Sequence, residues 1–355
     1  MITPVPNPYL ALLQGQRFDQ FLIGDHRANG QFSLVFEAQD TNSGAEVALK
    51  VLLPAHNPED LYEFQREADL LTSLEKSSNV VNLIKSHTAT INVTSERGIQ
   101  VPLPFHYHAM ELAAGCLEEI VLDRKKVYLR ERLQLWRAIV RGVHQMHRRQ
   151  IVHRDLKSSN CLVFPDCEIK LRAKVSDLGR GADTRVAHHF SPGEYLLGRG
   201  DFRFAPPECL FAQASPDRKA CKNADLYGLG SLLFELVTGQ GITSLALGFG
   251  PAIVKQAVSQ AVSGRTIDLS SLRGKFADAF LLFEQEVPTI IRELSSALLR
   301  QLCDPVPDMR LPKVRFGSRP VADNDLEWLI KRADILIKSL SVPRQRSVRA
   351  RRAVI

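Results

Sequence analysis

Three residues with the chemistry for phosphoryl transfer lie in one short polar segment, HRDLKSSN, at positions 153–160. The Asp155 carboxylate can accept the proton of an attacking hydroxyl, because a positioned carboxylate acts as a general base. Lys157 supplies a cation beside a transferring phosphate, and Asn160 supplies an amide oxygen that can hold Mg²⁺. The segment therefore indicates transfer of a phosphoryl group to a hydroxyl.

A second acidic residue follows in AKVSDLGR, where Asp177, Leu178 and Gly179 occupy consecutive positions. A divalent cation that bridges phosphates is usually held by one or two protein oxygens and water, so Asp177 and Asn160 would suffice as metal ligands. The alternative is an ordinary turn, since Asp and Gly are common turn residues. The choice between the two depends on the rest of the chain.

These segments resemble the catalytic loop and the Asp-Phe-Gly motif of the eukaryotic-like serine/threonine protein kinase family, with Leu178 in place of Phe. The resemblance implies an α+β, two-lobed fold, with a small β-rich N-lobe carrying one helix and a larger, mainly helical C-lobe. It also implies ATP as phosphate donor and Mg²⁺, or alternatively Mn²⁺, as cofactor. The implied function is transfer of the γ-phosphate of ATP to Ser/Thr hydroxyls of proteins.

A lysine and a glutamate of the same family's nucleotide site are found upstream. Lys50 projects from EVALKVL (46–52), which alternates like a half-buried strand. The helical stretch 58–76 carries Glu67, which we expect to hold Lys50, with Glu63 as the alternative. Glu67 is preferred because Leu71, one turn later on the same helical face, then falls where an apolar residue packs against the Asp177 motif.

The nucleotide itself is expected to lie between a loop and a hinge. The stretch ANGQFSLVFEA (28–38) resembles the family's phosphate-covering loop, although of its three glycine positions, Ala28, Gly30 and Ser33, only the second is glycine. Backbone groups of Glu111 and Ala113 are implied to bind the base. The apolar residues implied to surround it are Val35, Ala48, Met110 and Leu162.

Further motifs bear on the substrate. APPE (205–208) and NADLYGLG (223–230) resemble the family's protein-docking elements, and we expect Glu208 to pair with Arg310 and Asp225 to anchor the catalytic loop. Because small-molecule kinases lack this segment, protein substrates are expected. Lys157 is typical of the Ser/Thr branch.

One departure concerns the residue that precedes APPE in this family's Ser/Thr enzymes, a threonine that is here Asp201. The sequence allows Asp201 to pair with Lys157 directly, which would place a carboxylate near Asp155 and raise the proton affinity of one of them. Autophosphorylation is expected within 180–204, where the acceptors are Thr184, Ser191 and Tyr195, with Ser191 preferred.

The rival hypothesis from another class is a pseudokinase scaffold with weak or no catalysis, which the reduced glycine loop and Leu178 favour. The presence of Lys50, Glu67, Asp155, Asn160 and Asp177 argues against it. A small-molecule phosphotransferase is disfavoured by the docking elements.

Composition and charge bear on the domain boundaries, the C-terminal tail and the localisation. We expect a Pro-rich leader at 1–17, a kinase domain at 18–340 with its hinge at about 111–115, and an Arg-rich tail at 341–355. The five tail arginines supply most of the formal net charge of +7, so the tail is either a solvated terminus or a contact for a polyanion. An insertion is expected near 240–285. Without a signal peptide, a membrane span or paired cysteine motifs, the sequence predicts a cytoplasmic protein.

Overall fold

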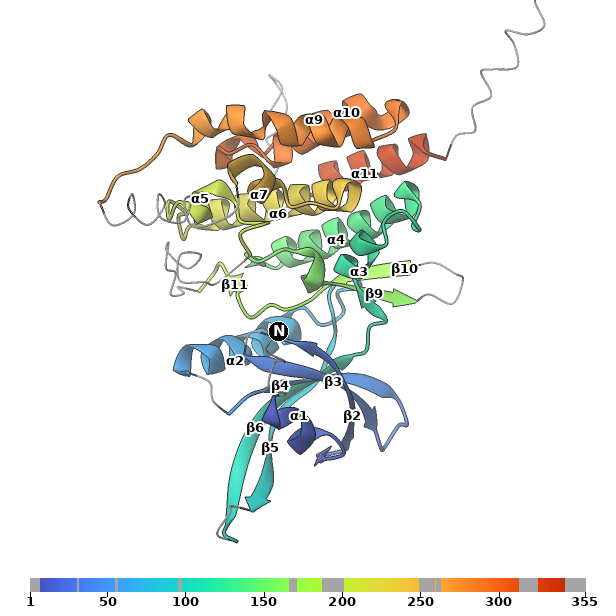
Figure 1. Ribbon diagram of the computed structural model, residues 1–355, viewed down its shortest axis with the longest axis vertical. Helices are drawn as coiled ribbons and strands as arrows, with labels where there is room; N and C mark the ends of the chain where they lie inside the picture. Colours follow the sequence, from blue (N-terminus) through green and yellow to red (C-terminus); the bar gives the residue numbers. More distant parts are fainter. Residues whose placement is uncertain are drawn as a thin grey trace, which may run out of the picture.

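Six antiparallel strands form one sheet in the N-terminal part of the chain (Figure 1). In this computed structural model, the described residues are 7–30, 32–54, 57–94, 98–165, 171–186, 201–248, 259, 263–312 and 325–341. The strand order is β1-β2-β3-β4-β6-β5. The strands are β1 (Arg17–Phe18), β2 (Phe21–Asn29), β3 (Ser33–Asp40), β4 (Glu46–Leu52), β5 (Leu83–Thr94) and β6 (Gln100–Glu111).

Aromatic side chains fill the core of this small lobe. Phe18, Phe105 and Tyr107 are fully buried, and the Phe18 ring lies 5.9 Å from that of Phe105 and 5.4 Å from that of Tyr107. Helix α1 (Pro8–Leu13), within the expected leader, packs on the same core through Leu13 and through an edge-on contact of Tyr9 with Phe105. Part of the leader is therefore structurally joined to the small lobe.

Helix α2 (Pro58–Ser73) lies against the sheet and carries the expected Glu67. Asn57 begins it with a reciprocal capping box, in which its side chain accepts from the Asp60 N–H and the Asp60 carboxylate accepts from the Asn57 N–H. Its buried residues are Phe64, Glu67, Ala68, Leu70 and Leu71, which recur at helical spacing. The pattern explains why one face of the helix is fixed against the strands.

The larger lobe is mainly helical, as expected (Figure 1). Its longer helices are α4 (Leu129–Arg148), α6 (Arg218–Thr238), α9 (Ala277–Glu286), α10 (Thr289–Leu302) and α11 (Glu327–Ser339). Its short helices are α3 (Leu117–Leu122), α5 (Pro207–Leu210), α7 (Ile242–Leu247), η1 (Ser158–Asn160), η3 (Leu269–Phe276) and η4 (Pro307–Met309). The short strands are β7 (Gly115–Cys116), β8 (Ile151–Val152), β9 (Cys161–Pro165), β10 (Leu171–Val175) and β11 (Ala182–Asp183).

Helix α6 runs through the centre of this lobe. Nearly all of its residues are buried, and it ends at Gly239, whose φ of +76° is the left-handed conformation that glycine adopts readily. It begins at Arg218, capped by the Asp217 carboxylate, about two turns before Asp225 of the NADLYGLG segment. Of the helices in the described ranges, none has the length and apolar character of a membrane span.

The connection between α2 and β5 fastens the small lobe to the large one. The Val81 N–H donates to the Val175 carbonyl at 2.9 Å, and the Val175 N–H donates to the Asn79 carbonyl at 2.9 Å. A side chain at Gly142 of α4 would place a Cβ only 2.4 Å from the Asn79 carbonyl oxygen, so glycine is required for this approach. Strand β10, which leads to Asp177, is thus attached to both lobes.

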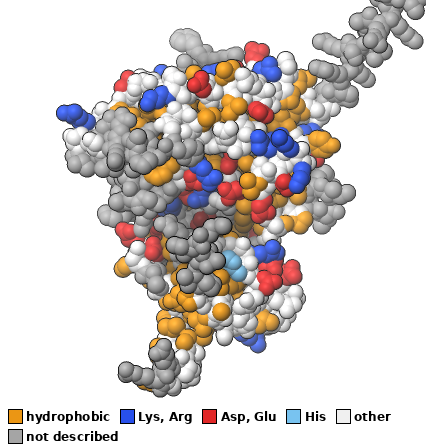
Figure 2. All heavy atoms as spheres, viewed as in Figure 1, with side chains coloured by type: hydrophobic (Ala, Val, Ile, Leu, Met, Phe, Trp, Pro, Cys, Tyr) orange, Lys and Arg blue, Asp and Glu red, His pale blue; other side chains and the backbone are white. Residues whose placement is uncertain are grey.

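The face of the large lobe seen in Figure 2 carries acidic and basic side chains interspersed with one another. Residues 342–355, which hold the five tail arginines, lie outside the described residues, as do most of the predicted acceptor loop (187–200) and residues 249–258 and 260–262 of the expected insertion.

Candidate active site

A buried ion pair joins the small-lobe sheet to helix α2 as expected. The Lys50 ammonium on β4 lies 2.7 Å from Oε2 of Glu67 and 3.0 Å from Oδ1 of Asp177. Burial by itself lowers the pKa of Lys50, but Asp177 and Glu67 outweigh it and raise that pKa above the usual value. The lysine therefore stays charged where it could attract phosphate. Glu63, the alternative partner, is not the residue that bonds Lys50.

Lys157 and Asn160, two predicted side chains of the catalytic loop, both contact the Asp155 carboxylate. The Lys157 Nζ lies 3.0 Å from Oδ2 of Asp155, and the Asn160 amide donates to the same oxygen at 3.2 Å and to the Asp155 carbonyl at 2.9 Å. The Asn160 amide nitrogen is turned toward Asp155, and its side-chain oxygen is of the kind that can accept a hydrogen bond or bind a cation. Residues 155, 157 and 160 therefore form one cluster between β8 and β9.

Asp225 of α6 binds the backbone of the catalytic loop 153–160 and fixes its conformation. Its carboxylate accepts from the backbone N–H of His153 at 2.9 Å and of Arg154 at 2.8 Å, and lies 2.8 Å from Nε2 of His147. Arg154 has a φ of +67°, an uncommon conformation for a residue with a side chain, and these bonds stabilise it. The expected anchoring role of Asp225 is confirmed by this geometry.

Asp177 lies on the segment that follows β10. Its carboxylate lies near Lys50, and this ammonium more than offsets the effect of burial and lowers the pKa of Asp177. Asn160 is tied to the same segment, because its carbonyl accepts from both the N–H and the hydroxyl of Ser176, at 2.9 and 3.0 Å. An ionised carboxylate and an amide oxygen are a donor set that suits Mg²⁺.

The predicted phosphate loop is the turn between β2 and β3. Ala28 pairs with Val35 across the two strands, and the Gly30 N–H donates to the Ser33 carbonyl at 2.8 Å. Ser33 is buried, so the serine at the third glycine position packs into the lobe. Gln31 lies outside the described residues.

Three of the four apolar residues expected around the base, Val35, Ala48 and Met110, lie on adjoining strands of the small lobe. Val35 of β3 pairs with Lys50 of β4, and Ala48 pairs with Met110 at the end of β6. Leu162 of β9 belongs to the large lobe and pairs with Cys116, just after the connection that contains Ala113. Leu162 is thus next to the connection 112–114, which joins β6 of the small lobe to β7.

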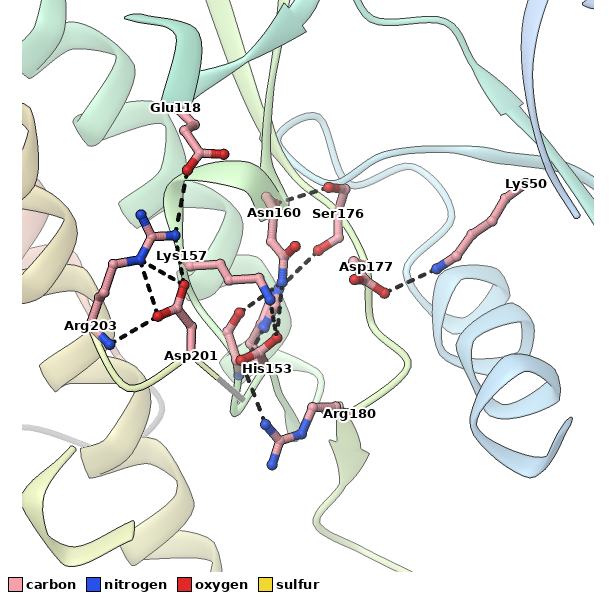
Figure 3. A network of polar contacts seen from close by, with 11 residues as sticks. Lys50, Glu118, His153, Lys157, Asn160, Ser176, Asp177, Arg180, Asp201 and Arg203 are labelled. Carbon is pink, nitrogen blue, oxygen red and sulfur yellow. Dashed lines mark hydrogen bonds and ion pairs between the residues drawn. The ribbon is translucent and has the colours of Figure 1, made fainter. Parts of the chain in front are cut away.

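Asp201 differs from the arrangement that the sequence allowed. Its carboxylate bonds the Arg203 guanidinium at 2.7 Å, and Arg203 also reaches Glu118 of α3 at 3.4 Å (Figure 3). Lys157 instead pairs with Asp155. The prediction that Asp201 could pair directly with Lys157 is therefore wrong. Arg203, only two residues along the chain, pairs with the Asp201 carboxylate instead.

The expected ion pair between Glu208 and Arg310 is confirmed. Glu208 accepts two hydrogen bonds from the Arg310 guanidinium, at 2.6 and 2.7 Å, and both side chains are buried. Two parallel bonds of this kind satisfy both charges, which buried ions require.

Sequence reasoning missed two contacts of this site. Arg180, directly after the Asp-Leu-Gly triplet, has its guanidinium 3.6 Å from Oδ1 of Asp155. The side chain of Glu111, considered only for its backbone, binds Lys174 of β10 at 2.6 Å. The spacing of these residues in the sequence predicts neither pair. One hint was available, because Arg180 directly follows the Asp-Leu-Gly triplet and could have been considered as a partner of Asp155.

Comparisons with known proteins agree with this geometry. A family model described as the protein kinase domain matches residues 24–311. The chain is 29% identical to cyclin-dependent kinase 9 of Homo sapiens over 210 residues, which are 59% of this chain and 53% of that protein. It is 32% identical to calcium/calmodulin-regulated receptor-like kinase 1 of Arabidopsis thaliana over 216 residues, 59% and 42% of the two chains. A third relative is mitogen-activated protein kinase 15 of Caenorhabditis elegans, 28% identical over 233 residues, 63% and 45% of the two chains. The match thus spans about half the length of these relatives.

Proposed function

Because the chain belongs to the protein kinase family, we propose that it transfers the γ-phosphate of ATP to serine and threonine hydroxyls of proteins, its own chain included. The observation that carries the proposal is the convergence of Lys50, Asp155 and Asp177 on one region, each with the partner that its role needs.

Asp155 is the proposed general base. Its carboxylate accepts the proton of the acceptor hydroxyl as that oxygen attacks the γ-phosphorus and the bond to the departing ADP breaks. Lys157 lies 3.0 Å from Asp155, so it is near enough to offset negative charge on the transferred group. Lys50, held by Glu67, would bind the nonreacting phosphates.

Asn160 and Asp177 would hold Mg²⁺, or Mn²⁺ in its place. The cation neutralises phosphate charge and orients the phosphates when it is bound. Both side chains offer oxygen, the donor that these hard cations prefer, and Lys50 keeps the Asp177 carboxylate ionised.

The adenine would lie among Val35, Ala48, Met110 and Leu162, with backbone groups of Glu111 and Ala113 as its hydrogen-bond partners. Ala28, Gly30 and Ser33 would border the phosphates. Lys157 and the two relatives that are cyclin-dependent and mitogen-activated kinases support the Ser/Thr assignment.

The test is incubation of the purified chain with γ-labelled ATP, Mg²⁺ and a mixed protein substrate, followed by phosphoamino-acid analysis. We expect phosphoserine or phosphothreonine, and loss of label in Lys50→Met and Asp177→Ala, because both residues act on phosphate charge. Dominant phosphotyrosine would reject the acceptor assignment. Absence of label with ATP still bound would favour the pseudokinase alternative.

A further inference from the structure

A buried histidine lies beside the Lys50–Glu67 pair and has no part in the proposed chemistry. His108 of β6 is directly opposite Lys50 of β4 in the antiparallel register. Side chains of directly opposed residues point to the same face of a sheet. Both side chains therefore face α2, and His108 is only 1% exposed.

His108 makes two contacts with one residue of α2. Its Nε2 lies 2.9 Å from the backbone carbonyl oxygen of Phe64, and its ring stacks on the Phe64 ring with centroids 3.8 Å apart and an angle of 16° between planes. Since a carbonyl can only accept, Nε2 carries the hydrogen and donates it.

The two strands thus hold α2 at neighbouring positions. Phe64 lies three residues before Glu67, almost one turn along the helix, so His108 binds the turn that precedes the one bound by Lys50. The His108 bond fixes the backbone of the helix, whereas the Lys50 bond depends on a side chain that is placed by that backbone. Burial lowers the pKa of His108 to about 4, so near neutral pH the ring is uncharged and adds no second cation beside Lys50.

We infer that His108 is a positioning residue, which holds α2 so that Glu67 can reach Lys50. Loss of the hydrogen bond frees the first turns of α2 from β6, and the Lys50–Glu67 pair then forms in a smaller fraction of molecules. The consequence for turnover rests on the proposed kinase activity, whereas the consequence for α2 does not.

The first test therefore needs no ATP. His108→Gln and His108→Met have similar shape, but only glutamine can donate a hydrogen bond to the Phe64 carbonyl. Amide hydrogen exchange of residues 65–71 should be about fivefold or more faster in His108→Met than in His108→Gln, since one such bond is worth roughly 1 kcal/mol. His106→Met, two residues earlier on the same strand, is the control and should leave α2 exchange unchanged. Equal exchange in the two His108 variants would overturn the inference.

The second test is a double-mutant cycle on ATP affinity and turnover. In the wild-type background, His108→Met should weaken binding of a fluorescent ATP analogue and lower turnover by about fivefold, with His108→Gln closer to wild type. In the Glu67→Gln background the same substitution should change either quantity less than twofold, because the pair it supports is already broken. Equal losses in the two backgrounds would show that His108 acts elsewhere. If the chain bound the analogue but had no turnover, this would count against the proposed function. The double-mutant cycle on affinity would still test the role of His108.

Discussion

The Lys174 ammonium lies 2.6 Å from each carboxylate oxygen of Glu111, and so ties the end of β6 to the strand that leads to Asp177. The Asn82 N–H donates to the same carboxylate at 2.7 Å. Three segments therefore meet at Glu111: the last strand of the small lobe, the α2–β5 connection and β10. Movement of β10 away from the end of β6 would break this contact.

Lys174→Met should lower the free energy of unfolding by about 1–2 kcal/mol, because it leaves a partly buried carboxylate without its cation. Denaturant unfolding measures the change. Lys331→Met is the control, since its pair with Glu327 is longer, at 3.6 Å, and exposed; its effect should stay within about 0.5 kcal/mol. Equal effects of the two substitutions would mean that the Glu111 contact contributes no more than a surface pair.

A second prediction concerns Glu235 of α6, which is 4% exposed. Its Oε1 accepts from the Ser158 hydroxyl at 3.1 Å, while Oε2 has no hydrogen-bond partner within the described ranges. Burial raises the pKa of Glu235 from 4.5 to about 7, with Glu118 and Asp201 adding repulsion. The folded chain thus holds a proton that the unfolded chain releases above pH 4.5.

The raised pKa of Glu235 determines how stability changes with pH. Stability falls as pH rises from 4.5 to 7, and above pH 7 the ionised group opposes folding by its full amount. Glu235→Gln should therefore stabilise the protein at pH 8, by on the order of 3 kcal/mol, and change little at pH 4.5. Thermal unfolding at the two pH values tests this. A stabilisation that is equal at both would show that titration of Glu235 is not its cause.

Local patterns predicted most of the elements that carry the site. The strand expected at 46–52 and the helix expected at 58–76 are found as β4 and α2 within a few residues. The start of α6 was harder to predict, because its first two turns are largely polar and give no apolar periodicity.

Side-chain partners were predictable only where the family motif names them. Glu67 and Arg310 are such partners, whereas Lys174, Arg180 and the Phe64 carbonyl meet their partners through tertiary packing. Asp201 shows the limit most clearly, because nothing in the motif indicates that Arg203 rather than Lys157 will neutralise it.

A third prediction is that a phosphate on Ser191 activates the enzyme. Arg154 donates to the Arg180 carbonyl at 3.3 Å, and Arg66 donates to the Gly179 carbonyl at 2.6 Å, so two guanidinium groups lie where this segment begins. A phosphate would pair with Arg154 and order the loop. Thr184 is a poorer acceptor, because its hydroxyl donates to the Gln150 carbonyl at 3.0 Å.

Mass spectrometry of active enzyme should find Ser191 modified, and Ser191→Ala should lower turnover. Ser191 and Tyr195 lie outside the described residues, so the choice between them rests on sequence. Fully active enzyme with an unmodified loop would reject this prediction.

Deletion of 341–355 should leave turnover on a short peptide nearly unchanged. The deletion removes five arginines and none of the inferred site residues. Binding to a polyanion such as heparin should weaken, and most at low salt, where exposed charges are least screened. Loss of peptide turnover with ATP binding retained would instead identify the tail as a docked regulatory element.

The most direct test of the central claim is single-turnover phosphate transfer by Asp155→Asn. Asparagine keeps the shape of the side chain but cannot accept the proton, so transfer should slow by about 10²- to 10⁴-fold while affinity for ATP stays within a few-fold of wild type. Asp123→Asn, an exposed aspartate paired with Lys126, is the matched control and should leave the rate unchanged. A wild-type rate in Asp155→Asn would contradict the assignment of Asp155 as the base and with it the proposed site.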